Sequence, residues 1–221
     1  MTLLLLGDSL AMSIGVREPG ETFGARLAQA VTDATDLPVD LRVLARAGAT
    51  TNLMQQQVAR AVDHRPGIAV VVVGSNDTLL PVPIGRCARY FGHALSRLRD
   101  GGWEVVVVPC ADPGNAPGFR TLVRWIASPR ARKLAGRQIR IAHYLDALIA
   151  PSSVEEFRTR AAELLSQDGV HPSPQGYAEH TGRVLPILLE AVAYLSRSAS
   201  ATGSVLSAGD PNISGSVMRP S

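Results

Sequence analysis

The chain has 221 residues, of which 46% are hydrophobic, 19% charged and 5% aromatic, and its formal net charge is +3. This length suits one α/β domain with a full core, and the composition is that of a soluble globular protein. The few aromatic residues, and arginines spread among acids without a block of like charge, argue against a nucleic-acid partner. Because the two cysteines form neither a CxxC motif nor a Cys/His cluster, we expect free thiols, no metal and no cofactor.

The N-terminal segment holds the first apolar run, at residues 3–6. This run is too short for the apolar core of a signal peptide, and it lacks a basic flank and a small-residue cleavage site. No stretch approaches the roughly 18 apolar residues of a membrane span. We therefore expect a cytoplasmic protein with no membrane contact.

Short apolar runs bounded by Gly, Pro or polar residues predict five strands that are buried on both faces. They lie at residues 3–6, 41–44, 68–73, 104–108 and 139–142. The runs at 70–73 and 105–108 consist of valine throughout, which favours a strand over a helix.

Helical spacing of apolar residues separates these runs and predicts six helices. They lie at residues 22–34, 51–62, 84–98, 119–134, 154–166 and 173–195. We expect Ser128 and Pro129 to break the fourth helix. Alternation of strands and helices predicts a three-layer α/β/α sandwich around a five-stranded parallel sheet with right-handed crossovers.

The C-terminal residues 198–221 are rich in Ser, Ala, Gly, Pro and Thr and show no hydrophobic period. We expect them to form a disordered tail. The predicted domain therefore covers residues 1–197.

Four polar motifs follow predicted strands or precede the last predicted helix. They are GDSL at 7–10, RAGAT at 46–50, GSND at 74–77 and DGVHP at 168–172. Ligands of open parallel sheets bind beyond the carboxyl ends of the strands, where such loops converge. We expect all four motifs to border one crevice.

These motifs, in this order, resemble the blocks of the SGNH (GDSL-type) hydrolases: a GDSL segment, an isolated glycine, a GxND segment and a DxxHP segment. GDSL or DxxH alone is a weak match, but four ordered matches at strand ends are a strong one. The resemblance runs from the first strand to the last helix. It implies a flavodoxin-like sandwich and a serine esterase that acts on a small-molecule ester through an acyl-serine intermediate.

By this resemblance, Ser9 is the nucleophile, His171 takes its proton, and Asp168 orients the imidazole. The Ser9 and Gly48 backbone N–H groups and the Asn76 side chain would form the oxyanion hole. The chemistry agrees, because a serine hydroxyl needs an adjacent base and convergent donors stabilise a developing oxyanion. An Asp-x-x-His turn can also place a carboxylate near Nδ1 of the imidazole.

Other polar residues near these motifs have simpler interpretations. Asp8 and Asp77 are expected to stabilise their turns, and the four other histidines to lie on the surface or in packing: His64, His93, His143 and His180. Asn115 and Phe119, in the loop after the fourth predicted strand, are candidates for substrate contact. The chain departs from the family in having Gly15 where a glycine usually follows the serine more closely.

Three alternatives remain open from the sequence. An O-acyltransferase or a deacetylase, acting on a sugar or a secondary metabolite, would use the same residues. A flavodoxin-like binding module could instead cradle a phosphate after the first strand, although GxGxxG and GxxxxGK[ST] are both missing there. An α/β-hydrolase elbow is disfavoured, because Ala11 occupies the second glycine position of GxSxG.

Overall fold

The computed structural model describes residues 1–151 and 154–207. Its centre is one sheet of five parallel strands in the order β2-β1-β3-β4-β5. The strands are β1 (Thr2–Gly7), β2 (Asp40–Val43), β3 (Ile68–Val72), β4 (Glu104–Val108) and β5 (Leu148–Ile149). This is the flavodoxin-like strand order, so the predicted fold class is confirmed.

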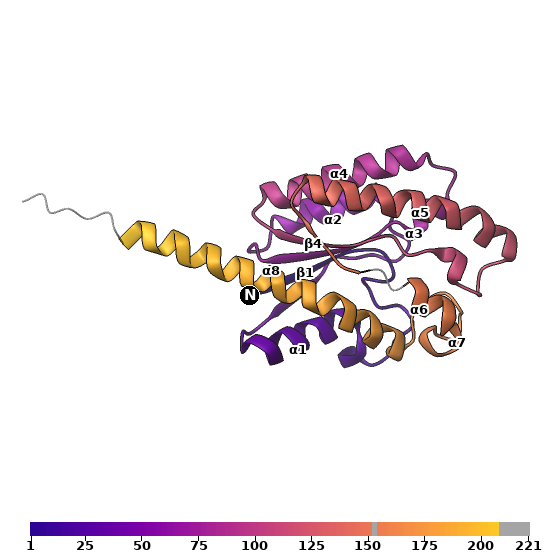
Figure 1. Ribbon diagram of the computed structural model, residues 1–221, viewed down its shortest axis with the longest axis horizontal. Helices are drawn as coiled ribbons and strands as arrows, with labels where there is room; N and C mark the ends of the chain where they lie inside the picture. Colours follow the sequence, from indigo (N-terminus) through magenta and orange to yellow (C-terminus); the bar gives the residue numbers. More distant parts are fainter. Residues whose placement is uncertain (152–153, 208–221) are drawn as a thin grey trace, which may run out of the picture.

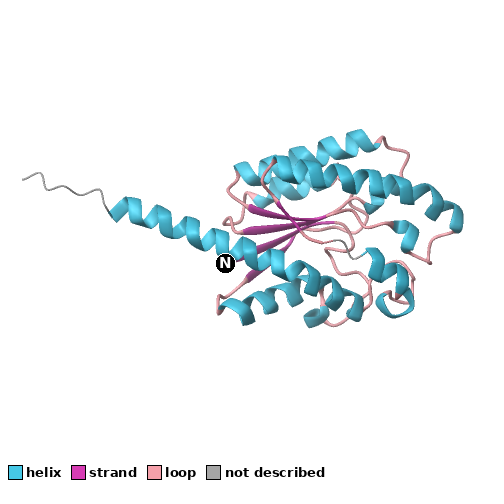
Figure 2. Ribbon diagram, viewed as in Figure 1, coloured by secondary structure: helices cyan, strands magenta, loops and turns pink. Residues whose placement is uncertain are grey.

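Helices cover both faces of the sheet (Figures 1 and 2). On one face lie α1 (Phe23–Thr35) and α8 (Pro174–Ser207), and on the other α2 (Met54–Ala61), α4 (Ile84–Asp100) and α5 (Thr121–Tyr144). The short elements are η1 (Pro19–Glu21), α3 (Ser75–Leu79), η2 (Pro113–Asn115), α6 (Val154–Thr159) and α7 (Ala161–Leu164). None of the described helices is both long and apolar enough to cross a membrane.

The leucines of β1 show why the sheet needs this double cover. Leu3 and Leu5 belong to the cluster that packs against α1 and α8, whereas Leu4 and Leu6 belong to the cluster against α2 and α4. All four side chains are fully buried. Since side chains alternate between the faces of a strand, a continuous apolar run requires helices on both sides.

Two predictions in the region of α5 are wrong. Residues 139–142 form the last turns of α5 and not a strand, because Leu134, Gln138 and Ala142 are buried at helical spacing. The fifth strand is the two-residue β5. Pro129 does not break the helix, since it lies on the exposed face, where water can reach the Trp125 carbonyl that loses its donor.

The last helix also exceeds its predicted bounds. It continues to Ser207, so residues 198–207, assigned from composition to a disordered tail, are helical. This segment contains no proline and continues a helix that is already nucleated. The rest of the predicted tail, residues 208–221, lies outside the described residues.

The two cysteines are free thiols, as the sequence predicted. Cys87 of α4 and Cys110, which follows β4, are both buried in a cluster with Leu134 of α5. Burial raises the pKa of Cys87 to about 11, with the nearby Asp77 carboxylate adding to the effect. Cys87 is therefore a packing residue and a poor nucleophile at neutral pH.

The carboxyl end of β1 is fixed by the side chain of Gln57. Its Oε1 accepts a hydrogen bond from the Gly7 N–H at 2.7 Å, and its Nε2 donates to the Gly7 carbonyl at 2.8 Å. Gly7 lies so close to β3 that a Cβ would be 1.8 Å from the Val72 carbonyl oxygen, and its φ of +134° is one that side chains disfavour. Together these contacts set the direction in which the chain enters the GDSL turn.

Replacing Gln57 by methionine keeps the volume but removes both hydrogen bonds. We expect Gln57→Met to lower the free energy of unfolding by about 1–3 kcal/mol, because the buried Gly7 N–H would lose its partner. Urea denaturation measures the change. Gln56→Met, at the exposed neighbouring position, is the matched control and should change stability little; equal losses in both variants would contradict this role of Gln57.

Candidate active site

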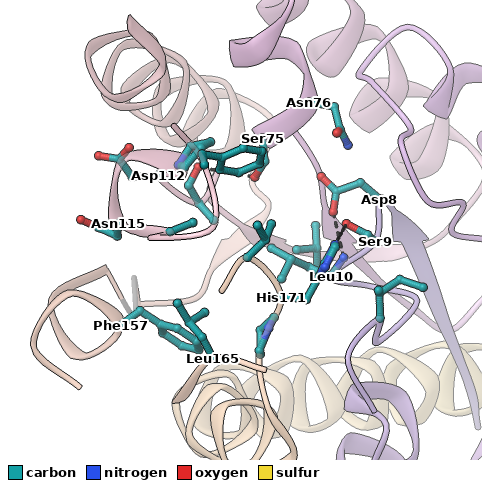
Figure 3. A pocket seen from close by; sticks show the side chains of 18 of the residues that line it. Asp8, Ser9, Leu10, Ser75, Asn76, Asp112, Asn115, Phe157, Leu165 and His171 are labelled. Carbon is teal, nitrogen blue, oxygen red and sulfur yellow. Dashed lines mark hydrogen bonds between the residues drawn. The ribbon is translucent and has the colours of Figure 1, made fainter. Parts of the chain in front are cut away.

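The four motifs meet at one cavity beyond the carboxyl edge of the sheet (Figure 3). The cavity has a volume of about 550 Å³. Ser9, Gly48, Asn76 and His171, each from a different motif, all line it. Four loops far apart in the sequence therefore converge as parallel strand ends require.

Ser9, His171 and Asp168 form a continuous hydrogen-bonded set. The Ser9 Oγ lies 3.0 Å from Nε2 of His171, and the His171 Nδ1 lies 2.6 Å from Oδ2 of Asp168. With Nδ1–H facing the carboxylate, Nε2 is left to accept the serine proton. This arrangement can remove a proton from Ser9 and stabilise the imidazolium that results.

Asp168 is fixed by more than the imidazole. Its Oδ1 accepts hydrogen bonds from the Ser166 hydroxyl at 2.8 Å and from the backbone N–H groups of Val170 and His171 at 2.8 and 2.9 Å. Partial burial acts to raise the pKa of the Asp168 carboxyl, but the hydrogen bonds from His171, Val170 and Ser166 together hold it well below the usual range. Asp168 is therefore a carboxylate throughout the neutral range.

The loop after Ser9 packs directly beneath the histidine. A Cβ on Gly15 would lie 2.5 Å from the Pro172 carbonyl oxygen and 3.3 Å from Cβ of His171, and the φ of Gly15 is +103°. The Tyr177 hydroxyl of α8 donates to the carbonyl of Ile14 at 2.9 Å. The position of Gly15, at which this chain departs from the family pattern, thus gives the His171 loop room to approach Ser9.

Gly48 and Asn76 are held together across the cavity by a second network. The Asp77 carboxylate accepts from the N–H and hydroxyl of Thr51 at 2.9 and 2.6 Å, and the Asn76 Nδ2 donates to the Ala49 carbonyl at 3.0 Å. Gly48 adopts φ +74° at the turn. Asp77 has the structural role expected of it, and the loop it fixes presents Gly48 to the cavity.

Two backbone N–H groups at this cavity are not used by the fold. Among the described residues, the N–H groups of Ser9 and Gly48 donate no hydrogen bond, whereas their neighbours Asp8, Leu10 and Ala49 do. The Nδ2 of Asn76 keeps a second hydrogen beyond the one given to Ala49. Three donors beside Ser9 are thus available to a ligand oxygen.

Asp8 lies beside the serine at the cavity, and its side chain is buried. Its Oδ1 accepts from the Leu10 N–H at 3.1 Å, while Oδ2 is buried without a hydrogen-bond partner among the described residues. Burial raises the pKa of Asp8 to about 7, the Leu10 N–H opposes the shift, and the Asp77 carboxylate adds to it. The hydrogen bond to Leu10 supports a structural role in the turn, and the second oxygen is free to carry a proton.

Opposite Ser9, the cavity is lined by the polar side chains of Asp112 and Asn115 and by the apolar side chains of Phe157 and Leu165 (Figure 3). Phe119 lines the same cavity. The sequence had singled out Asn115 and Phe119 only as candidates for substrate contact, and both lie where such contact can occur.

The remaining histidines do not join the catalytic set. His64 is half-buried, and His93 and His143 are exposed. His180 lines the cavity with its ring 5.0 Å from that of Phe23, and burial, with the nearby Arg183, lowers its pKa to about 4. Over the described part of the chain, no three His, Cys, Asp or Glu side chains gather as a metal site would require.

Several residues that build the site carry no motif signal in the sequence. Gln57, Thr51 and Ser166 each act through one or two hydrogen bonds to a motif residue. Only Ser166 could have been suspected, because serine and aspartate close to one another often bond locally in turns. Phe157 and Leu165 reach the cavity only through the fold of α6 and α7.

The molecule is a doubly wound α/β sandwich with a hydrogen-bonded serine, histidine and aspartate at the carboxyl edge of its sheet. This combination of side chains recurs in hydrolases of several unrelated folds. Comparison with known proteins gives the particular group. The chain belongs to the GDSL-like lipase/acylhydrolase family, whose model matches residues 5–179. The family resemblance seen in the sequence is thereby confirmed.

Individual relatives agree with this assignment. The chain is 29% identical over 181 residues to the GDSL-like esterase Rv1075c of Mycobacterium tuberculosis, covering 80% of this chain but only 58% of that one. It resembles the structure of the psychrotrophic esterase EstA from Pseudoalteromonas sp. (TM-score 0.69, 15% identity, 87% and 98% of the two chains) and that of TesA (0.73, 18%, 86% and 99%). At such low identity the structural likenesses show the fold alone.

The buried carboxyl of Asp8 should make stability depend on pH. Below pH about 4, the Asp8 carboxyl is protonated in both the folded and the unfolded protein. Between pH about 4 and 7, only the unfolded chain releases this proton. The free energy of unfolding therefore falls as pH rises through this range. Asp8→Asn cannot titrate, so wild type should lose stability relative to this variant over that window. Urea titrations at several pH values measure the difference. Asp63→Asn, at an exposed position, should give a flat difference, and a flat result for Asp8→Asn would contradict the buried neutral carboxyl.

Proposed function

We propose that the protein is a serine esterase that hydrolyses an uncharged small-molecule ester through an acyl-serine intermediate. One observation carries this proposal: the Ser9 Oγ lies 3.0 Å from Nε2 of His171, whose Nδ1 is 2.6 Å from the Asp168 carboxylate. Membership of the GDSL-like lipase/acylhydrolase family supports it. So does the 29% identity over 181 residues to the GDSL-like esterase Rv1075c.

In the first half-reaction, the Ser9 oxygen attacks the ester carbonyl carbon while its proton passes to Nε2 of His171. The carbonyl π-bond electrons move to the oxygen and give a tetrahedral oxyanion. When this intermediate collapses, the bond to the alkoxy oxygen breaks, and the His171 imidazolium protonates the departing alcohol. Asp168 stabilises the imidazolium in between, because it remains ionised beside Nδ1.

The oxyanion would be bound by the N–H groups of Ser9 and Gly48 and by Nδ2 of Asn76. These donors are available, because the two N–H groups make no hydrogen bond within the described residues. The Asn76 amide donates only one of its two hydrogens, to the Ala49 carbonyl. The Thr51–Asp77 contact fixes the loops of Gly48 and Asn76 in advance, and the Gln57 hydrogen bonds to Gly7 fix the entry to the Ser9 turn. Fixed donors are effective because they need no reorganisation as charge develops, and one such donor contributes about 3–4 kcal/mol.

In the second half-reaction, His171 takes a proton from water, the water oxygen attacks the acyl carbonyl, and Ser9 leaves with the proton returned. An alcohol could take the place of water with the same residues, which is the acyl-transfer alternative. The apolar side chains of Phe157 and Leu165 opposite Ser9, and that of Phe119 in the same cavity, favour an uncharged acyl group.

A serine-directed fluorophosphonate should label Ser9 with one adduct per chain. The reason is that the phosphonate resembles the tetrahedral intermediate and reacts only with an activated hydroxyl. Intact mass and peptide mapping locate the adduct, and turnover of p-nitrophenyl esters of increasing chain length is followed in parallel. Ser9→Ala should abolish both labelling and turnover, whereas Ser13→Ala should keep a reactive Ser9; labelling at another serine would refute the assignment.

The same preparations separate hydrolysis from acyl transfer. Release of free acid in plain buffer at the full rate supports an esterase. Product formation that requires an added alcohol, with a new ester as the product, supports an acyltransferase instead.

Loss of the Asn76 side chain should affect the transition state more than substrate binding. We expect Asn76→Ala to lower kcat by roughly 10²–10³ with little change in KM, because the amide is proposed to bind the oxygen mainly once it is charged. Initial-rate kinetics measure the split, and circular dichroism checks that the lost bond to Ala49 has not altered the fold. Asn52→Ala, at an exposed position on the neighbouring loop, is the control. A raised KM with unchanged kcat would make Asn76 a substrate-binding residue.

A further inference from the structure

Three large apolar side chains stand in solvent on the first turns of α5. Leu122 is 65% exposed, Trp125 76% and Ile126 50%. Positions three and four residues apart share one face of a helix, so the three side chains form a single patch. Contiguous apolar patches of this kind mark interaction surfaces, whereas single exposed residues do not.

Two contacts tie the start of α5, which carries this patch, to the loops that line the cavity. Phe119, which lines the cavity, is three residues before Leu122, and the Arg124 Nε donates to the Gly114 carbonyl at 2.8 Å, which holds the start of α5 against η2. One helical turn after Ile126, Arg130 donates to the Leu80 carbonyl at 2.7 Å. Leu80 is itself exposed and follows Leu79 of the cavity wall, so the Arg130 contact connects the helix of the patch to that wall.

The same segment is strongly cationic. Residues 113–145 contain seven Arg or Lys and no Asp or Glu. Arg120, Lys133 and Arg140 are exposed, and none of the three forms an ion pair with another described residue. The expectation that basic residues are interspersed with acids along the chain is therefore wrong for this stretch, which forms a single helix with its preceding loop.

We infer that the docking face, formed by Leu122, Trp125 and Ile126 with Arg120 and Lys133, binds the surface of an anionic lipid bilayer. Aromatic and aliphatic side chains that insert at the headgroup level, flanked by cations that face lipid phosphates, are the combination by which peripheral helices bind membranes. Tryptophan suits this depth because its ring is apolar and its N–H is polar. Binding in this way would bring the cavity mouth to the lipid surface.

Two other occupants that an apolar patch could have are disfavoured, a second copy of the chain by charge and nucleic acid by the lack of aromatic rings. A second copy of the chain would place two cationic helices against each other across a two-fold axis, and like charges repel. Nucleic acid would match the charge, but three side chains in one patch include only one ring for stacking. The inference replaces the expectation of no membrane contact, which had rested on the absence of a spanning segment.

The two tryptophans of the chain make binding directly observable. Trp103 is 3% exposed, whereas Trp125 is 76% exposed, so a change in emission on adding vesicles reports the docking face. With Ser9→Ala protein, which excludes hydrolysis, we expect a blue shift and protection from iodide on vesicles of phosphatidylcholine containing about 30% phosphatidylglycerol, and no change with phosphatidylcholine alone. This binding does not depend on esterase activity, so its failure and failure of the proposed function are distinguishable.

Vesicle flotation of variants then tests whether the docking face is the surface that binds the vesicles. The triple variant Leu122→Ser, Trp125→Ser, Ile126→Ser should bind the anionic vesicles at least about tenfold more weakly. Val62→Ser removes an apolar side chain that is 75% exposed on α2 and should bind like the parent. In the background with Ser9 intact, both should turn over a soluble ester at the parental rate, because none of the four residues lines the cavity.

Three results would overturn the inference. One is no shift and no flotation of the parent protein with anionic vesicles. Another is undiminished flotation of the triple variant, or equal binding to vesicles of phosphatidylcholine alone. The third is a dimer by light scattering that only the triple variant dissociates, which would make a second copy the occupant.

Discussion

The hydrogen bond between Ser9 and His171 joins residues 162 positions apart in the chain, and most of the described structure serves to close it. Ser9 is placed by β1, whose end is fixed by the two hydrogen bonds of Gln57 to Gly7. His171 is placed from the other side, by its own contact with Asp168 and by the close approach of Gly15 to the following residue. Gln57 bonds to the backbone of Gly7, and Asp168 accepts from the backbone N–H groups of Val170 and His171, so both ends of the 3.0 Å contact are fixed through the main chain.

How far the sequence could predict this structure follows from the kind of signal each element carries. Continuous valine runs identified β3 and β4, since only strands covered on both faces need such a pattern. The two-residue β5 has no period to detect, and the apolar residues at 139–142 fit either a strand or the buried side of a helix. The predicted helix break at Pro129 is wrong for a related reason. The effect of a proline inside a helix depends on whether it faces solvent, and only the fold determines this.

The residues that line the candidate site were easier to predict than the residues that hold them in place. Ser9, Gly48, Asn76 and His171 were found because the resemblance fixes their order and the parallel sheet fixes their meeting place. Gln57 and Thr51 were not, because a buried amide or hydroxyl that bonds backbone or a carboxylate leaves no spacing pattern in the chain. The position of Asp8 in the sequence predicts its role in the turn. Its raised pKa could not be predicted, because that shift depends on complete burial, which only the fold shows.

The docking face arises from a mismatch of lengths. The 24 residues of α5 span about 36 Å, whereas the five residues of β4 beneath it span about 17 Å. The helix therefore extends beyond the carboxyl edge of the sheet (Figure 1), and its first buried residue is Ala127. Leu122, Trp125 and Ile126 lie on this overhang, where no sheet can cover them. Since the cavity beside Ser9 lies beyond the same edge of the sheet, the overhang exposes its apolar surface on the side of the molecule where that cavity lies.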